Sequence, residues 1–176
     1  MRRVLFVLVV VLLAVFQPAT AEDAPQQVPV FPNLAFTALD GVSQIDLESL
    51  RGQPVLLTFW ASWCGPCRQE LPELEKLAGD LEETGFVLIT VNMDQSPAMG
   101  ERFLQKYDID VPAYRMNPRD LSQLGVQALP TNVLLDREGR PVQIFRGYSP
   151  EVPAEIRRLV LAMEGNPQEG ENPSGK

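Results

Sequence analysis

The sequence predicts an α/β fold in which helices flank a central sheet. Residues 55–60 and 86–92 are short apolar runs with the length and β-branched composition of buried strands. Between them, leucines recur at helical spacing over residues 71–81. A crossover helix makes the two strands that it joins parallel, and this order of elements is typical of α/β domains. The 176 residues are enough for one domain with a sizeable core, so we expect a single domain.

The helix between these strands contains two prolines. Pro66 suits the first turn of a helix, where its missing amide would have no partner, so the helix should open there. Pro72 lies inside the apolar period and should kink the helix rather than end it. We expect Gly85 to stop the helix.

The residues before the first buried strand predict a small hairpin. Residues 34–36 and 43–45 are strand candidates on either side of Asp40-Gly41, a turn pair. Residues 47–52 should form a short helical turn that leads into the strand.

Helices and strands also alternate after the second strand. Ser96-Pro97 should open a helix, and residues 111–116 form an extended segment behind it. Leucines and a valine over residues 121–126 suggest a short helix.

The last part of the domain predicts a hairpin and a helix. Residues 132–135 and 142–145 are strand candidates around a turn at 136–139. Ser149 and Pro150 are candidates for the cap and the first residue of a final helix. Its buried face should carry Ile156, Leu159, Val160 and Met163.

The N-terminal residues are typical of a secretory signal peptide. Two arginines precede thirteen apolar residues, Val4 to Phe16, and an Ala-x-Ala pattern ends at Ala21. The apolar stretch is shorter than the roughly 18 residues of a spanning helix, so we expect cleavage after Ala21 and an extracytoplasmic, for example periplasmic, protein. An anchor formed by residues 4–16 is the alternative. The predicted organisation is a leader at 1–21, a linker at 22–33, a folded domain at 34–164 and a disordered tail at 165–176.

The charge limits the classes of ligand. The formal net charge is −8, and it becomes more negative if Arg2 and Arg3 leave with the leader. Nucleic acid and anionic lipid are therefore excluded as expected ligands, because both repel an acidic protein. The acidity is explained by a soluble surface that resists aggregation.

Redox chemistry is predicted at Cys64 and Cys67, which Gly65-Pro66 separates at the turn into the first helix. The positive end of a helix stabilises a thiolate, which makes Cys64 the expected attacking sulfur. Cys67 should be more buried and should close the disulfide. A structural disulfide is the alternative, but so small a ring constrains the unfolded chain least. A zinc site needs four ligands, and the chain has two cysteines and no histidine.

Residues 59–67, Phe-Trp-Ala-Ser-Trp-Cys-Gly-Pro-Cys, resemble the active site of the thioredoxin superfamily. The N-terminal hairpin and the extra helix and strand over residues 96–116 resemble its exported TlpA/ResA branch. The resemblance implies a thioredoxin-like fold with a mixed central sheet, an N-terminal β-hairpin and a central helix-strand insertion.

Leu129-Pro130-Thr131 resembles the cis-proline loop of the superfamily, which faces the cysteine pair. The resemblance implies a cis bond before Pro130, although only about 5–6% of X-Pro bonds in folded proteins are cis. It also implies that client segments bind at Leu129 as an added strand. An ordinary loop proline is the alternative. The predicted substrate-binding residues are Trp63, Gly65, Pro66, Leu129 and Pro130.

Thr58 departs from thioredoxin itself, which has a buried aspartate there as the proton acceptor for the second cysteine. Glu70 is our candidate for that role, because it lies one helical turn after Cys67, and ResA-like proteins have a functional glutamate at the matching position. Partial burial should raise the pKa of the Glu70 carboxyl and let it act as a general base. A solvated surface charge is the alternative.

The resemblance implies a thiol:disulfide oxidoreductase whose only redox group is the Cys64–Cys67 pair, without a further cofactor or metal. We expect a monomeric reductase of client proteins, for example in cytochrome c or copper-site assembly, that a membrane thiol donor keeps reduced. Gly-Pro between the cysteines resembles reducing thioredoxins near about −270 mV rather than oxidants near about −120 mV. The alternatives are a disulfide oxidase or isomerase, and a copper(I)-binding module that uses the two thiolates with Met93, Met99 or Met116.

Overall fold

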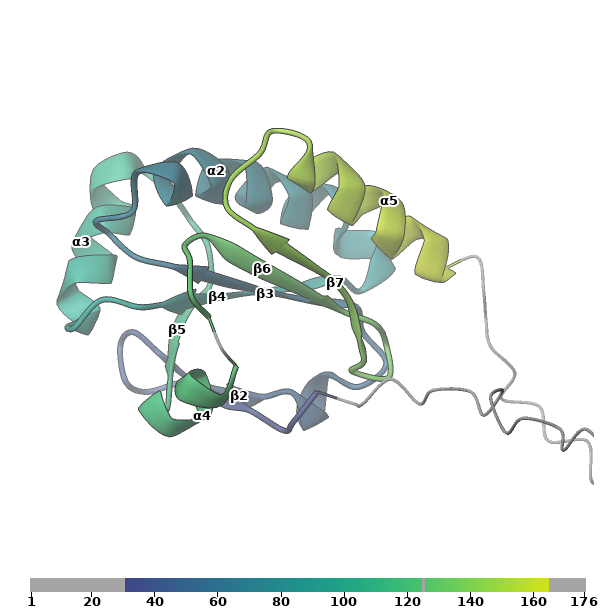
Figure 1. Ribbon diagram of the computed structural model, residues 1–176, viewed down its shortest axis with the longest axis horizontal. Helices are drawn as coiled ribbons and strands as arrows, with labels where there is room; N and C mark the ends of the chain where they lie inside the picture. The colour runs from purple at the N-terminus through teal and green to yellow at the C-terminus, as the bar shows by residue number, and fades with distance from the viewer. Residues whose placement is uncertain (1–30, 125, 165–176) are drawn as a thin grey trace, which may run out of the picture.

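The computed structural model describes residues 31–124 and 126–164, and these residues form one mixed sheet between helices (Figure 1). The seven strands are ordered β2-β1-β5-β4-β3-β6-β7. Strands β3, β4 and β5 are parallel, whereas β1, β2, β6 and β7 pair antiparallel with their neighbours. The predicted mixed sheet is therefore confirmed. The strands are β1 Ala35–Ala38, β2 Gln44–Asp46, β3 Val55–Trp60, β4 Val87–Asn92, β5 Ala113–Met116, β6 Thr131–Leu135 and β7 Pro141–Arg146.

Helices cover both faces of the sheet (Figure 1). Helices α2 and α5 lie together on one face, with α3 beside the start of α2, and α4 lies on the opposite face. The α-helices are α2 Gly65–Asp80, α3 Pro97–Tyr107, α4 Pro118–Gln123 and α5 Val152–Glu164; the 3₁₀ turns are η1 Glu48–Leu50 and η2 Glu82–Thr84.

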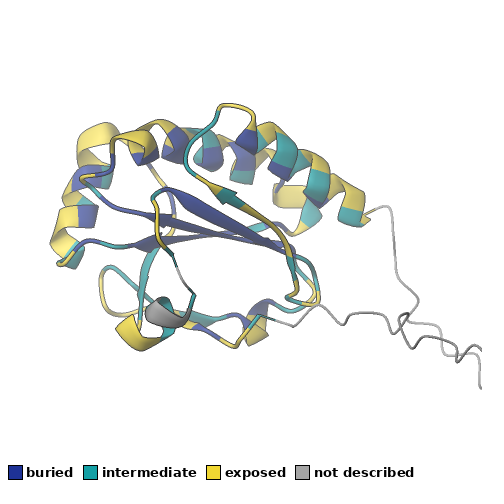
Figure 2. Ribbon diagram, viewed as in Figure 1, coloured by how far each residue is buried: buried dark blue, intermediate teal, exposed yellow. Residues whose placement is uncertain are grey.

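Alternating side chains of the central strands supply two apolar layers, and β3 and β6 are buried along their whole length (Figure 2). Leu56 and Trp60 pack under α2 and α5, whereas Leu57 and Phe59 pack towards the N-terminal hairpin. Because side chains alternate across a strand, Thr58 belongs to the α2 side of the sheet.

The structure confirms most predicted elements. The N-terminal hairpin forms as β1 and β2, and η1 occupies the predicted helical turn. The predicted insertion forms α3 and β5, and β5 lies between β1 and β4. Helix α2 continues through Pro72, as expected.

Three predicted boundaries were wrong. Helix α2 ends at Asp80 rather than at Gly85, because the tighter turn η2 follows it and Gly85, at φ 72°, caps that turn. Helix α5 begins at Val152, because Ser149 and the next two residues form a separate turn closed by the Val152 amide on the Ser149 carbonyl. Helix α4 ends at Gln123, before the last residue of the predicted short helix.

The predicted leader, the tail and residues 22–30 of the predicted linker lie outside the described residues. The described chain begins in contact with the β6–β7 turn and with η1, since the Phe31 amide donates to the Gly139 carbonyl at 2.8 Å and the Asn33 side chain accepts from the Glu48 amide at 3.1 Å. Within residues 31–124 and 126–164, no helix has the length and apolar character needed to cross a membrane.

Candidate active site

The two cysteines lie where strand β3 leads into helix α2, and they form a disulfide with an S–S distance of 2.03 Å. Cys64 is the N-cap of α2, with an extended backbone at φ −86° and ψ 103°. Its sulfur accepts a hydrogen bond from the Cys67 amide at 3.2 Å. The helix N-terminus therefore faces the Cys64 sulfur and stabilises negative charge on it when the disulfide opens.

The surroundings of the disulfide differ between its two sides. Cys67 is fully buried, and Cys64 is 5% exposed. Trp63 is 68% exposed, and Gly65 and Pro66 are exposed as well. The Cys64 side of the disulfide is therefore the more exposed one, and Cys67 is the more buried cysteine, as the sequence predicts.

Asp94, which was not among the residues predicted from the sequence, holds the loop that leads into Cys64. The buried Asp94 carboxylate accepts hydrogen bonds from the Ser62 amide at 3.1 and 3.2 Å and from the Ser62 hydroxyl at 2.9 Å. Asn92 donates to the same carboxylate at 2.9 Å. Gly100 lets α3 pack on Asn92, because a Cβ there would lie 2.8 Å from the Asn92 amide nitrogen. Strand β4 and helix α3 thus fix the active-site loop.

The loop before β6 lies at the same end of the sheet as the disulfide. The Leu129–Pro130 bond is cis, which confirms that expectation from the resemblance. Thr131 pairs with Phe59, close to the end of β3, and Leu129 packs against the core cluster that contains both cysteines. The Pro130 carbonyl accepts a hydrogen bond from the Gly147 amide at 2.8 Å. Two predicted substrate-binding residues are therefore brought to the disulfide end of the sheet.

Glu70 lies on α2 one turn after Cys67 and is fully buried, so the interpretation as a solvated surface charge is wrong. Its Oε1 accepts a hydrogen bond from the Asn132 side-chain amide at 2.8 Å. Its Oε2 is buried with no hydrogen-bond partner in the described structure. An unpartnered buried oxygen favours a proton on the carboxyl group, because a charged oxygen in that position would lose its hydration without compensation.

Burial raises the pKa of the Glu70 carboxyl from 4.5 to about 7. The cost of removing a carboxylate from water is the main cause, and the negative charge of Glu73 adds to it. The hydrogen bond from Asn132 acts in the opposite direction, because it stabilises the charged form. The direction agrees with the sequence-based expectation and gives Glu70 the acidity of a general base near neutral pH.

Asn132 and Thr58 complete a buried polar group beneath α2. The Thr58 hydroxyl donates to the Asn132 side-chain oxygen at 2.8 Å, so the amide nitrogen of Asn132 points to Glu70. All three side chains are fully buried. Asn132 was not among the residues predicted from the sequence, although an asparagine inside an apolar strand is a signal, since a buried amide needs polar partners.

The described residues contain no group of three or more histidine, cysteine, aspartate or glutamate side chains that could hold a metal ion. Of the methionines that the copper alternative would use, Met116 packs in the core cluster on the other side of the sheet from the cysteines. Met99 is 36% exposed. The redox group that the structure contains is the disulfide.

Comparison with known proteins gives consistent matches. A family model described as Redoxin matches residues 24–159. The thiol-disulfide oxidoreductase ResA of Bacillus thuringiensis subsp. konkukian is 32% identical over 117 residues, which are 66% of this chain and 67% of that protein. The ResA of Bacillus subtilis is 30% identical over 121 residues, which are 68% of this chain and 67% of that protein.

Solved structures share the fold. A proposed protein disulfide isomerase from Bacteroides thetaiotaomicron has a TM-score of 0.70 and 31% identity, over 79% of this chain and 90% of that one. A proposed thiol:disulfide interchange protein DsbE from Chlorobium tepidum has a TM-score of 0.68 and 29% identity, over 76% of this chain and 94% of that one.

Proposed function

Since the chain belongs to the Redoxin family and is a ResA-like thiol:disulfide oxidoreductase of the thioredoxin superfamily, we propose that it reduces disulfides in client proteins. The observation that carries the proposal is the pairing of the Cys64–Cys67 disulfide at the N-terminus of α2 with the buried Glu70 one turn further on. This arrangement supplies an accessible nucleophile, a buried resolving thiol and a proton acceptor in one helix.

The proposed reaction has two exchange steps. The Cys64 thiolate of the reduced protein attacks one sulfur of a client disulfide, and the other client sulfur leaves as a thiolate. Glu70 takes the proton of the Cys67 thiol, and the resulting thiolate attacks Cys64 and displaces the client. Two electrons have then passed to the client, which leaves with two thiols, and the protein is left with its disulfide.

The surroundings of the sulfurs support the reducing direction. Among the described residues, the Cys64 sulfur of the disulfide accepts a single hydrogen bond, from the Cys67 amide. The chain has no histidine to stabilise a thiolate. A carboxylate at Glu70 opposes a second negative charge nearby. Strong oxidants need a more strongly stabilised reduced thiolate than a single amide hydrogen bond next to a carboxylate provides.

We propose export as the setting of this reaction. The apolar leader over residues 1–21 supports an extracytoplasmic location, where a thiol pair has to be kept reduced by a partner. A membrane thiol donor would supply the electrons, and Trp63, Gly65, Pro66, Leu129 and Pro130 would contact the client. We propose a monomer for the folded domain.

A reduction potential measured against a dithiothreitol or glutathione series tests the direction. We expect a value near about −270 mV, and a value above about −180 mV would overturn the reductase assignment. The isomerase alternative has one observation in its favour, the likeness to the Bacteroides structure. The redox state of the cysteine pair in cells separates a reductase from a disulfide oxidase, because a reductase is kept in the dithiol form and an oxidase in the disulfide form.

A further inference from the structure

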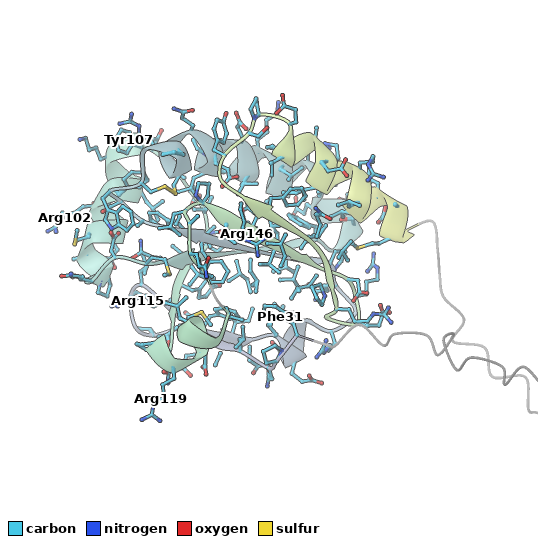
Figure 3. All side chains as sticks on the ribbon, in the orientation of Figure 1. Phe31, Arg102, Tyr107, Arg115, Arg119 and Arg146 are labelled. Atoms are coloured by element: carbon cyan, nitrogen blue, oxygen red, sulfur yellow. A yellow bond between two sulfur atoms is a disulfide. The ribbon has the colours of Figure 1, made fainter. Side chains whose placement is uncertain are left out.

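Four basic side chains surround the end of the sheet that carries the disulfide, although the net charge of the chain is −8. They come from four different elements, α2, α3, β5 and β7. We call them the cationic rim: Arg68, Lys106, Arg115 and Arg146. Figure 3 labels Arg115 and Arg146 and the tyrosine beside Lys106.

Arg68 and Lys106 meet over one aromatic ring. Arg68 directly follows Cys67, and its guanidinium lies 5.3 Å from the centre of the Tyr107 ring. The Lys106 ammonium lies 5.2 Å from the same centre. Arg68 also donates a hydrogen bond to the Tyr107 hydroxyl at 3.1 Å, which leaves the hydroxyl hydrogen free for another acceptor. Two cations and one hydroxyl donor, from α2 and the end of α3, are thus gathered beside the first turn of α2.

Arg115 and Arg146 extend the rim across the sheet. The Arg115 guanidinium donates to the backbone carbonyl of Asp94 at 3.4 Å, and the Asp94 carboxylate holds the loop before the disulfide. Arg146 pairs across the sheet with Thr131, the residue after the cis-proline. Both positions are at the disulfide end of their strands.

The rim residues differ in their pairing from four arginines elsewhere in the domain. No rim residue forms an ion pair with a described carboxylate, and Glu101 and Asp108 of the α3 region do not pair with it. The arginines that do form ion pairs lie at the far end of the domain, at η1, the β6–β7 turn and α5. They are Arg51, Arg140, Arg157 and Arg158. Arg137 at the β6–β7 turn also lacks a carboxylate partner, but its guanidinium donates to the Gly52 and Thr84 carbonyls. Around the redox site, the rim residues leave positive charge that a carboxylate of another molecule can pair with.

We propose that the cationic rim binds acidic residues beside the client disulfide, so that the protein prefers polypeptide segments in which aspartate or glutamate flanks the reacting cysteine. The inference rests on the proposed reductase function and names its class of client. Charges at the edge of an interface act on the association rate and on its salt dependence. Exposed pairs are individually weak, so several are needed for a measurable preference.

Three peptides of equal length, each with one disulfide, test the preference. Their flanking residues are acidic, neutral (Asn and Gln) or basic, and the rate of reduction by the reduced protein is measured at about 0.01 M and about 1 M salt, where the screening length falls from about 30 Å to about 3 Å. At low salt the acidic peptide should react about 5- to 20-fold faster than the neutral one, and the basic peptide slowest. High salt should remove the difference.

Matched double variants assign the effect to the rim. Arg68→Gln with Arg146→Gln leaves Lys106 and Arg115 in place and should lower the ratio of the acidic to the neutral rate towards one, whereas Lys76→Gln with Arg158→Gln removes the same charge elsewhere and should keep the ratio. Because the same protein reduces both peptides, this ratio cancels any change in thiol reactivity that the loss of Arg68 causes. Equal rates for the acidic and neutral peptides in the wild type, or an undiminished preference in the rim variant, would overturn the inference while reduction of the neutral peptide still supports the reductase. If no peptide is reduced, the proposed function itself fails, and the inference fails with it.

Discussion

Replacing Glu70 with glutamine should make the stability of the oxidised protein much less dependent on pH. In the folded protein the pKa of Glu70 is raised from 4.5 to about 7 by burial, so folding favours the protonated carboxyl. The stabilisation is fully present below pH 4.5, where the unfolded chain is protonated as well, and it is lost as the pH rises through the folded pKa of about 7. Glutamine is neutral at every pH, so the Glu70→Gln variant does not lose this stabilisation.

The magnitude follows from the interval between the two pKa values. At about 1.4 kcal/mol for each pH unit, the interval from 4.5 to about 7 corresponds to a loss of about 3 kcal/mol in the wild type. The chain has no histidine, and the cysteines are held as a disulfide. The other carboxyl groups and the α-amino group are shared by the variant and the wild type, so their titrations cancel in the difference between the two proteins. The free energy of unfolding of Glu70→Gln relative to the wild type should therefore rise by about 3 kcal/mol between pH 4.5 and pH 8.

Urea unfolding of both oxidised proteins at half-unit steps over this range measures the difference. Glu75→Gln is the matched control, because it removes a carboxylate from a less buried position on the same helix and should give no such pH-dependent difference. If the difference in the free energy of unfolding between Glu70→Gln and the wild type stayed constant from pH 4.5 to 8, the raised pKa of Glu70 and the burial argument behind it would be wrong.

Other variants test the remaining parts of the site. In the reduced protein, Glu70→Gln should lower the titration midpoints of the thiols, since a negative charge beside them is lost, and unchanged midpoints would remove Glu70 from the proposed chemistry. Asn132→Leu should raise the pKa of Glu70 above about 7, because the hydrogen bond that stabilises its charged form is lost; carboxyl titration by infrared spectroscopy measures this, and a lowered pKa would contradict it. Cys67→Ser should trap clients on Cys64 as mixed disulfides, whereas Cys64→Ser should trap far less, because Cys67 is buried; equal capture would refute the assigned roles. Mass spectrometry of exported protein should find a chain that begins after Ala21, and a membrane-held chain that begins at Met1 would identify an anchor instead.

The sequence alone determined the order of elements and the position of the redox pair. Apolar runs identified β3 and β4 because a fully buried strand needs apolar side chains on both faces, and the helical period of leucines identified α2. Cys64 could be placed at the N-terminus of a helix because strand, turn residues and helix follow one another directly in the chain. Local sequence patterns were sufficient to predict these strands, the helix and the position of Cys64, because each depends on residues that are neighbours in the chain.

Helix boundaries were less accurate, because competing turns decide them. Gly85 caps a 3₁₀ turn that follows α2, and the turn that begins at Ser149 delays α5 to Val152. A longer helix and a shorter helix with an adjoining turn give hydrogen-bond partners to the same backbone groups. The spacing of apolar residues does not distinguish these two arrangements.

Only the tertiary structure decided what surrounds Glu70. The helical period placed it on the same face as Cys67, but its complete burial results from α2 packing over the sheet. Asn132, 62 residues away, and Thr58 reach it only because β6 pairs with β3 beneath α2. The pKa of a carboxyl group depends on solvation and on partners across the fold, and these are set by packing between segments that are distant in the chain.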